Sequence, residues 1–121
     1  VRSVHEIRFR TPFSEAGEAL LDELSENLPP ALEIGYTATP DLRVWVHPAG
    51  LTQRRVVMIL TPRSGGKMRC ECMATPEACK LLGITASAVE GATKVRFEFD
   101  PADFDASLLF ALMGAAAQNI A

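Results

Sequence analysis

The sequence is short of the residues that most often carry chemistry. Its 121 residues include three cysteines, two histidines, one tryptophan and one tyrosine. Cys70 and Cys72 have no second cysteine pair to complete a tetrahedral metal site, and both histidines lie far from them in sequence. An odd number of cysteines favours free thiols in a reducing cytosol. We therefore predict no metal and no cofactor, and we expect a cytoplasmic protein.

Long hydrophobic runs are missing as well. The longest apolar stretch, residues 106–117, is too short to cross a bilayer. The first residues do not form a basic segment followed by an apolar run, so we expect no signal peptide. These features predict a protein that does not act in a membrane.

The remaining composition is that of an ordinary globular protein, with 48% hydrophobic and 22% charged residues. A chain of this length buries roughly two-thirds of the surface that it exposes when unfolded, which is enough for a core without disulfides. No repeat, low-complexity tract or linker interrupts the sequence. We predict a single α+β domain over residues 1–121.

Turn residues and hydrophobic alternation divide the chain into strands and helices. Ser14 and Thr75 are predicted N-caps of two helices, which end near Pro29 and Gly83. Residues 84–92 fit either a strand or a loop. The clearer strands are predicted at residues 4–10, 31–38, 42–47, 54–60, 67–73 and 94–100.

A third helix closes the chain, with Asp100 or Asp105 as its cap. The predicted order is therefore β-α-β-β-β-β-α-(β)-β-α. Consecutive strands joined by tight turns indicate a single antiparallel sheet of five to six strands. We expect the helices to pack on one face of it.

The stretch LTPRSGGKMRCEC, residues 60–72, raises the question of a phosphate-binding loop. A Walker loop needs an earlier glycine and a following helix, and this stretch has neither. A hairpin with Gly65 and Gly66 as a two-residue turn fits better, because glycine readily adopts positive φ. That turn would pair Ile59 with Cys72 and Thr61 with Cys70, and would place the cysteines on an apolar face with Val57 and Ile59.

Charge is unevenly distributed along a chain whose net charge is −3. Residues 15–26 carry five acids and no base, and residues 54–69 carry five bases and no acid. Such runs form either solvated faces or a surface for a charged partner. The net negative charge, and the lack of an aromatic residue in 54–69, disfavour nucleic acid. The predicted partner-binding residues are Arg54, Arg55, Arg63, Lys67 and Arg69.

The closing helix is apolar on nearly all sides, as a deeply buried helix or an interface helix is. Small residues along it permit close approach of another backbone. The strand VVMIL, residues 56–60, is also apolar on both faces. We therefore expect a homodimer, the commonest assembly. The predicted interface residues are Leu109, Phe110, Met113 and Ala117.

Few residues suggest catalysis. Cys79 lies early in its helix, where the dipole can lower a thiol pKa, but the sequence places no base near it. A pocket between sheet and helices is the alternative kind of site, with Tyr36, Trp45 and His47 as its candidate residues.

These patterns favour a non-enzymatic binding or assembly protein that acts as a small homo-oligomer. In its general features the chain is similar to secretion chaperones and adaptor modules, with which it shares no specific motif. The alternatives are a small-molecule-binding protein or enzyme with the pocket just described, and a nucleic-acid-binding protein that uses the basic hairpin.

Overall fold

A computed structural model describes residues 13–37, 43–50, 56–89 and 94–120, and the side chains of Thr37 and of residues 118–120 lie outside this description. Six strands form one sheet in the order β1-β2-β3-β4-β6-β5, and every neighbouring pair is antiparallel. Two longer helices, a short one and two 3₁₀ turns complete the described elements. The predicted α+β class, the antiparallel sheet and the order of the described elements are confirmed.

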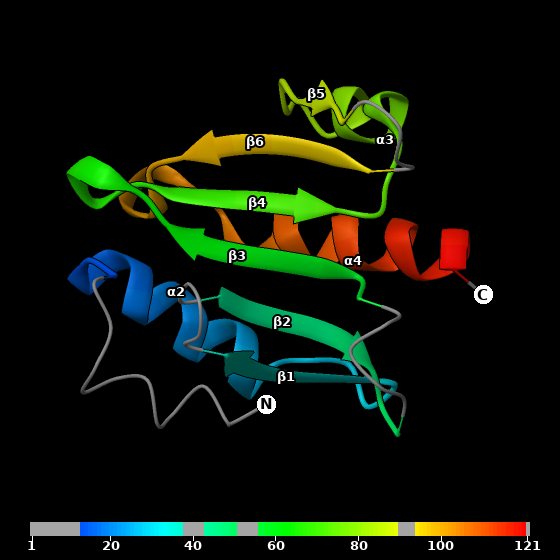
Figure 1. Cartoon of the computed structure of the whole chain (residues 1–121), viewed down its shortest axis with the longest axis horizontal. Coiled ribbons are helices and arrows are strands. Elements are labelled where there is room, and N and C mark those ends of the chain that lie inside the picture. Colours follow the sequence, from blue (N-terminus) through cyan, green and yellow to red (C-terminus); the bar gives the residue numbers. More distant parts are fainter. Residues whose placement is uncertain (1–12, 38–42, 51–55, 90–93, 121) are drawn as a thin grey trace.

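The elements follow one another with short connections (Figure 1). Their bounds are α2 Glu15–Glu26, β1 Leu32–Thr37, β2 Arg43–Pro48, β3 Met58–Pro62, η2 Ser64–Gly66, β4 Met68–Cys72, α3 Pro76–Leu81, β5 Ser87–Ala88, β6 Val95–Phe99, η3 Pro101–Asp103 and α4 Ala106–Ile120. The ambiguous stretch after α3 contains a two-residue strand, β5. The strand predicted at residues 4–10 lies outside the described residues.

The helices begin where short polar side chains can cap them. The Ser14 hydroxyl accepts a hydrogen bond from the Gly17 amide at 3.1 Å, and Thr75 caps α3 in the same way. Asp100 caps the 3₁₀ turn η3, and Asp105 accepts from the Ser107 amide at the start of α4, so Asp105 is the one of the two candidate caps that lies at the closing helix. Each cap satisfies an amide that has no partner inside its helix.

One face of the sheet is covered by α2 and α4, which lie side by side behind the strands in Figure 1. From α2 the core receives Leu20, Leu21 and Leu24, all 5% exposed or less. From α4 it receives Leu109, Leu112 and Met113, which are fully buried. The strands meet them with buried side chains at alternating positions: Val44 and Val46, Met58 and Leu60, Met68, Cys70 and Cys72, and Val95, Phe97 and Phe99.

The β3–β4 hairpin differs from the prediction by one residue. Its turn has three residues, Ser64–Gly66, and the Arg63 amide donates to the Lys67 carbonyl oxygen at 2.8 Å. Gly65 and Gly66 have φ of 74° and 77°, so both adopt the left-handed conformation that favours glycine. The glycines were correctly placed in the turn, but the two-residue loop was wrong.

The extra turn residue changes the register of the hairpin. Met58 pairs with Cys72 and Leu60 pairs with Cys70, whereas the sequence prediction paired Ile59 with Cys72. Because side chains alternate between faces, a slip of one residue exchanges them all. Met58 and Leu60 therefore share the helix-covered face with the cysteines, and Ile59 lies on the opposite face beside Glu71.

Within the described parts of the chain, no helix is long and apolar enough to span a bilayer.

Candidate functional site

The face of the sheet opposite α2 and α4 is the candidate site, and we call it the open face. No helix of the described ranges covers it (Figure 1). Its central row runs across four strands and contains Trp45, Ile59, Glu71 and Arg96, which neighbour one another by register. The first three are half-buried and Arg96 is exposed. The open face therefore combines apolar and charged side chains in one row.

Glu71 holds two bases on the open face. Its Oε2 atom lies 3.0 Å from Lys94 Nζ and 3.5 Å from the Arg96 guanidinium. Partial burial acts to raise the pKa of Glu71, but the hydrogen bond and charge of Lys94, together with Arg96, outweigh it and lower the pKa. Glu71 therefore stays ionised at neutral pH, and its carboxylate forms ion pairs with two cations.

The next row of the open face contains Arg69 between Thr61 and Glu98. Glu98 accepts from Arg63 at 3.4 Å. The Nε atom of Arg69 is buried and has no hydrogen-bond partner among the described residues. A buried N–H without an acceptor is unfavourable, because its hydrogen bond to water is lost on folding and is not replaced by one within the protein.

The acidic and basic side chains of this region do not balance. Strands β4 and β6 and the residues next to them include three acids, Glu71, Glu98 and Asp100. The same region, together with Arg63 that pairs with Glu98, includes five bases: Arg63, Lys67, Arg69, Lys94 and Arg96. This part of the open face is positive although the whole chain has a net charge of −3.

A small hollow of about 180 Å³ adjoins the central row. Val56, Ile59 and Met73 give it apolar walls, and Glu71 and Lys94 contribute to its lining. Pockets for small molecules have volumes of roughly 300–1,000 Å³. The hollow is smaller than that range and suits one side chain better than a whole metabolite.

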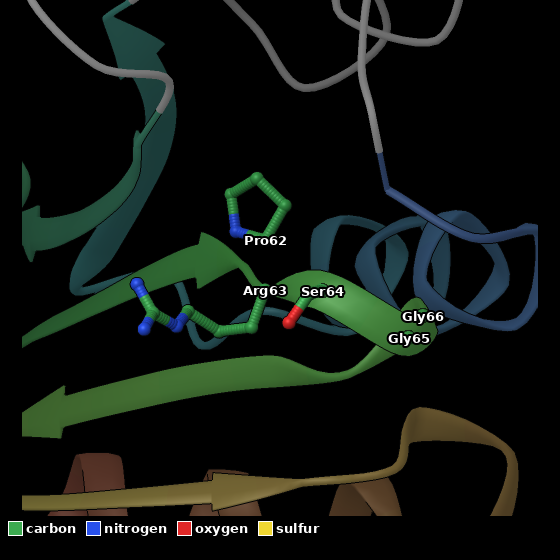
Figure 2. Close-up of a pocket in the computed structure, with 5 residues that line it drawn as sticks. All are labelled: Pro62, Arg63, Ser64, Gly65 and Gly66. Atoms are coloured by element: carbon green, nitrogen blue, oxygen red, sulfur yellow. The ribbon is translucent and has the colours of Figure 1, made fainter.

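A second hollow, of about 520 Å³, lies at the hairpin tip and is shown in Figure 2. Among the described residues, five consecutive ones, Pro62 to Gly66, line it, and no other described element contributes a converging polar group. Ser14 at the start of α2 donates to the Gly66 carbonyl oxygen at 3.2 Å, which ties the tip to the helix. The Arg63 side chain extends back along the strands and away from the glycines (Figure 2).

The predicted partner-binding residues are distributed over two places. Arg63 and Lys67 are exposed at the hairpin tip and Arg69 lies on the open face, whereas Arg54 and Arg55 lie outside the described residues. Two bases were missed, Lys94 and Arg96. The alternation of these two bases with apolar residues is apparent in the sequence. Their position beside Arg69 and Glu71 follows only from the pairing of β6 with β4.

The three residues predicted to line a pocket do not come together. Tyr36 pairs with Val44 and is 4% exposed in the core, on the helix-covered face. Trp45 and His47 lie at the alternate positions of β2, on the open face. His47 is 7% exposed, and its Nδ1 atom lies 3.1 Å from the Pro48 carbonyl oxygen.

The three thiols are free and buried, Cys70 and Cys72 on β4 and Cys79 on α3. Burial raises the pKa of Cys72 to about 12, with a smaller effect of Cys79. Burial also raises the pKa of Cys70 well above its usual value, and it raises that of Cys79. Cys79 therefore lacks the lowered pKa that a helix dipole can provide to a nucleophile. The described residues contain no cluster of histidine, cysteine and acidic side chains that could hold a metal ion.

The predicted interface residues divide between core and surface. Leu109 and Met113 are fully buried within their own chain, so they offer no surface to a second copy. Phe110 and Ala117 are half-buried on α4, next to the exposed Ala111. Up to residue 117, the outward-facing part of α4 is therefore composed of smaller side chains than predicted.

Comparisons of the chain with protein-family models, curated proteins and solved structures give no match.

Proposed function

We propose that the chain is a non-enzymatic binding or assembly protein of the adaptor type, which acts in the cytosol as a homodimer. Two copies associate through the outward side of α4. This arrangement leaves the open face of each sheet available to a further partner, because α4 packs against the opposite face.

The observation that carries the proposal is the outward side of α4. Its fifteen residues include no charged side chain. One side of the helix packs into the core, and among residues 106–117, whose side chains are described, the exposed positions on the other side are Ser107, Ala111 and Gly114. Exposed helix faces usually carry charged or larger polar residues. A Cβ atom added at Gly114 would meet nothing within 4 Å, so a second helix has room to approach closely.

The titratable groups support a binding role over a catalytic one. A general acid or base works best with a pKa near the working pH. Burial raises the pKa values of Cys70 and Cys72, while Glu71 and Asp105 have lowered pKa values because they accept hydrogen bonds. Each of these shifts moves the group away from neutral pH.

Size-exclusion chromatography with light scattering tests the dimer. We expect the wild-type chain to have twice the monomer mass at micromolar concentration. Ala111→Arg places a charge in the proposed interface and should give a monomer that remains folded, because position 111 is exposed in the single chain. A wild-type monomer at high concentration would contradict the proposal.

Ala19→Arg is the matched control. Ala19 is also an exposed alanine within a helix, on α2, and the substitution adds the same side chain. We expect this variant to remain a dimer. If Ala19→Arg and Ala111→Arg gave the same mass, the interface would not be on α4.

A further inference from the structure

We propose that the open face binds an acidic segment of a partner protein, which inserts one apolar side chain into the hollow beside Ile59. The inference rests on the proposed binding function but not on the α4 interface, since the open face lies on the opposite side of the sheet.

The first step is the charge of this surface. Five bases and three acids lie together on and beside β4 and β6, and Glu71 is already paired with both Lys94 and Arg96. The lowered pKa of Glu71 keeps this carboxylate ionised, so the local excess of positive charge persists at neutral pH. Carboxylates of a partner complement this surface, whereas a basic segment would be repelled.

The second step is the incomplete hydrogen bonding of Arg69. Its Nε atom is buried and lacks an acceptor within the described part of the chain, and the neighbouring Glu98 accepts from Arg63 instead. Buried polar groups are nearly always hydrogen-bonded in native proteins. Because this atom is itself buried, an oxygen of a partner does not reach it directly, but a carboxylate of a partner would compensate the charge of the Arg69 guanidinium, since Glu98 is already engaged by Arg63.

The third step is the hollow. Its volume of about 180 Å³ and its walls of Val56, Ile59 and Met73 fit a single aliphatic or aromatic side chain. A hollow of this kind beside a charged row provides an anchor point, which protein partners commonly fill with one large apolar residue. Nucleic acid would satisfy the bases with phosphates but would bring no aliphatic side chain. The apolar walls therefore favour a protein segment.

The test begins with an unbiased selection. Random twelve-residue peptides displayed on phage are selected against the immobilised full-length chain at low salt. We expect enriched sequences in which one large apolar residue is flanked by aspartate or glutamate. Absence of enrichment, or enrichment of neutral or basic sequences, would overturn the inference.

The most enriched peptide is then synthesised with a fluorescent label and titrated by anisotropy. Arg96→Glu and Ile59→Asp should each weaken its binding about tenfold or more, because one reverses a complementary charge and the other places a charge in the hollow. Lys80→Glu, the same charge reversal at an exposed position on α3, should bind as the wild type does. Circular dichroism establishes that each variant is folded, and equal effects of Arg96→Glu and Lys80→Glu would overturn the site.

Two further measurements separate the alternatives. A labelled single-stranded RNA of twelve nucleotides replaces the peptide in the same titration, and RNA binding stronger than peptide binding would favour nucleic acid and overturn the inference. The peptide is also titrated against Ala111→Arg. Retained binding by a monomeric variant is expected, because the open face does not depend on the proposed dimer.

Discussion

Two neighbouring rows of the same sheet have opposite characters. Tyr36, Val44, Leu60, Cys70 and Phe97 form a row in which every side chain is 6% exposed or less. The adjacent row is displaced by one residue on each strand and is the central row of the open face, which contains both apolar and charged side chains. The first row fills the space under the helices and contains no charge. The second row is less deeply buried, and its charged members Glu71 and Arg96 pair with each other.

The largest difference between the rows is expected in stability. Leu60→Ala removes a fully buried side chain and should lower the free energy of unfolding by about 3 kcal/mol. Ile59→Ala removes a side chain of the same size from the next position, where it is only half-buried. This substitution should lower the free energy of unfolding by about 1 kcal/mol, because the Ile59 side chain buries a smaller apolar area than the Leu60 side chain does. Urea unfolding of both variants measures the two values.

This pair of variants also tests the hairpin register. The two-residue turn that the sequence favoured would exchange the positions of Ile59 and Leu60 relative to the helices. If Ile59→Ala were as destabilising as Leu60→Ala, the two side chains would be equally buried, which would contradict the observed register.

A smaller effect is expected from the charges of the open face. Glu71→Gln removes the carboxylate shared by Lys94 and Arg96 and should lower the free energy of unfolding by about 1 kcal/mol at pH 7. The side chain of Glu71 is 14% exposed. Glu98→Gln is the matched control, because Glu98 pairs with Arg63 at a position where its side chain is 48% exposed. Its effect should be a few tenths of a kcal/mol.

The effect of Glu71→Gln should depend on pH. The folded-state pKa of Glu71 is lowered, so its contribution is full above the unfolded-state value of about 4.3 and disappears as the pH falls through the folded-state pKa. Unfolding of wild type and variant by urea at pH 7 and in the acid range should therefore show curves that converge below pH 4.3. A constant difference down to the lowest pH would show that the ion pairs do not cause it.

Much of the fold follows from local signals. The caps at Ser14 and Thr75 and the alternation on β6 were read directly from residue types, because each depends on contacts within a few positions. The hairpin register could not be read from residue types in this way, because the segment Arg-Ser-Gly-Gly-Lys is equally compatible with a turn of two or of three residues. The contact between Ser14 and Gly66, 52 residues apart, accompanies the three-residue turn and has no local signal.

The candidate site was predicted only in part. The basic character of residues 63–69 was evident in the sequence, whereas the role of Lys94 and Arg96 depends on which strand pairs with β4. The sequence prediction grouped Tyr36 with Trp45 in a pocket between sheet and helices. Strand alternation together with the register places them on opposite faces. Pairings between distant strands are the information that a single sequence does not contain.

The most direct test compares the methyl groups of Ile59 and Leu60 by nuclear magnetic resonance. A soluble gadolinium chelate broadens signals near the protein surface, and the selected acidic peptide is then added. We predict that the Ile59 methyl signal is broadened by the chelate and protected by the peptide, while the Leu60 signal is little affected in either case. Equal broadening of both residues, or a peptide that leaves Ile59 unprotected, would contradict the assignment of the open face as the binding surface.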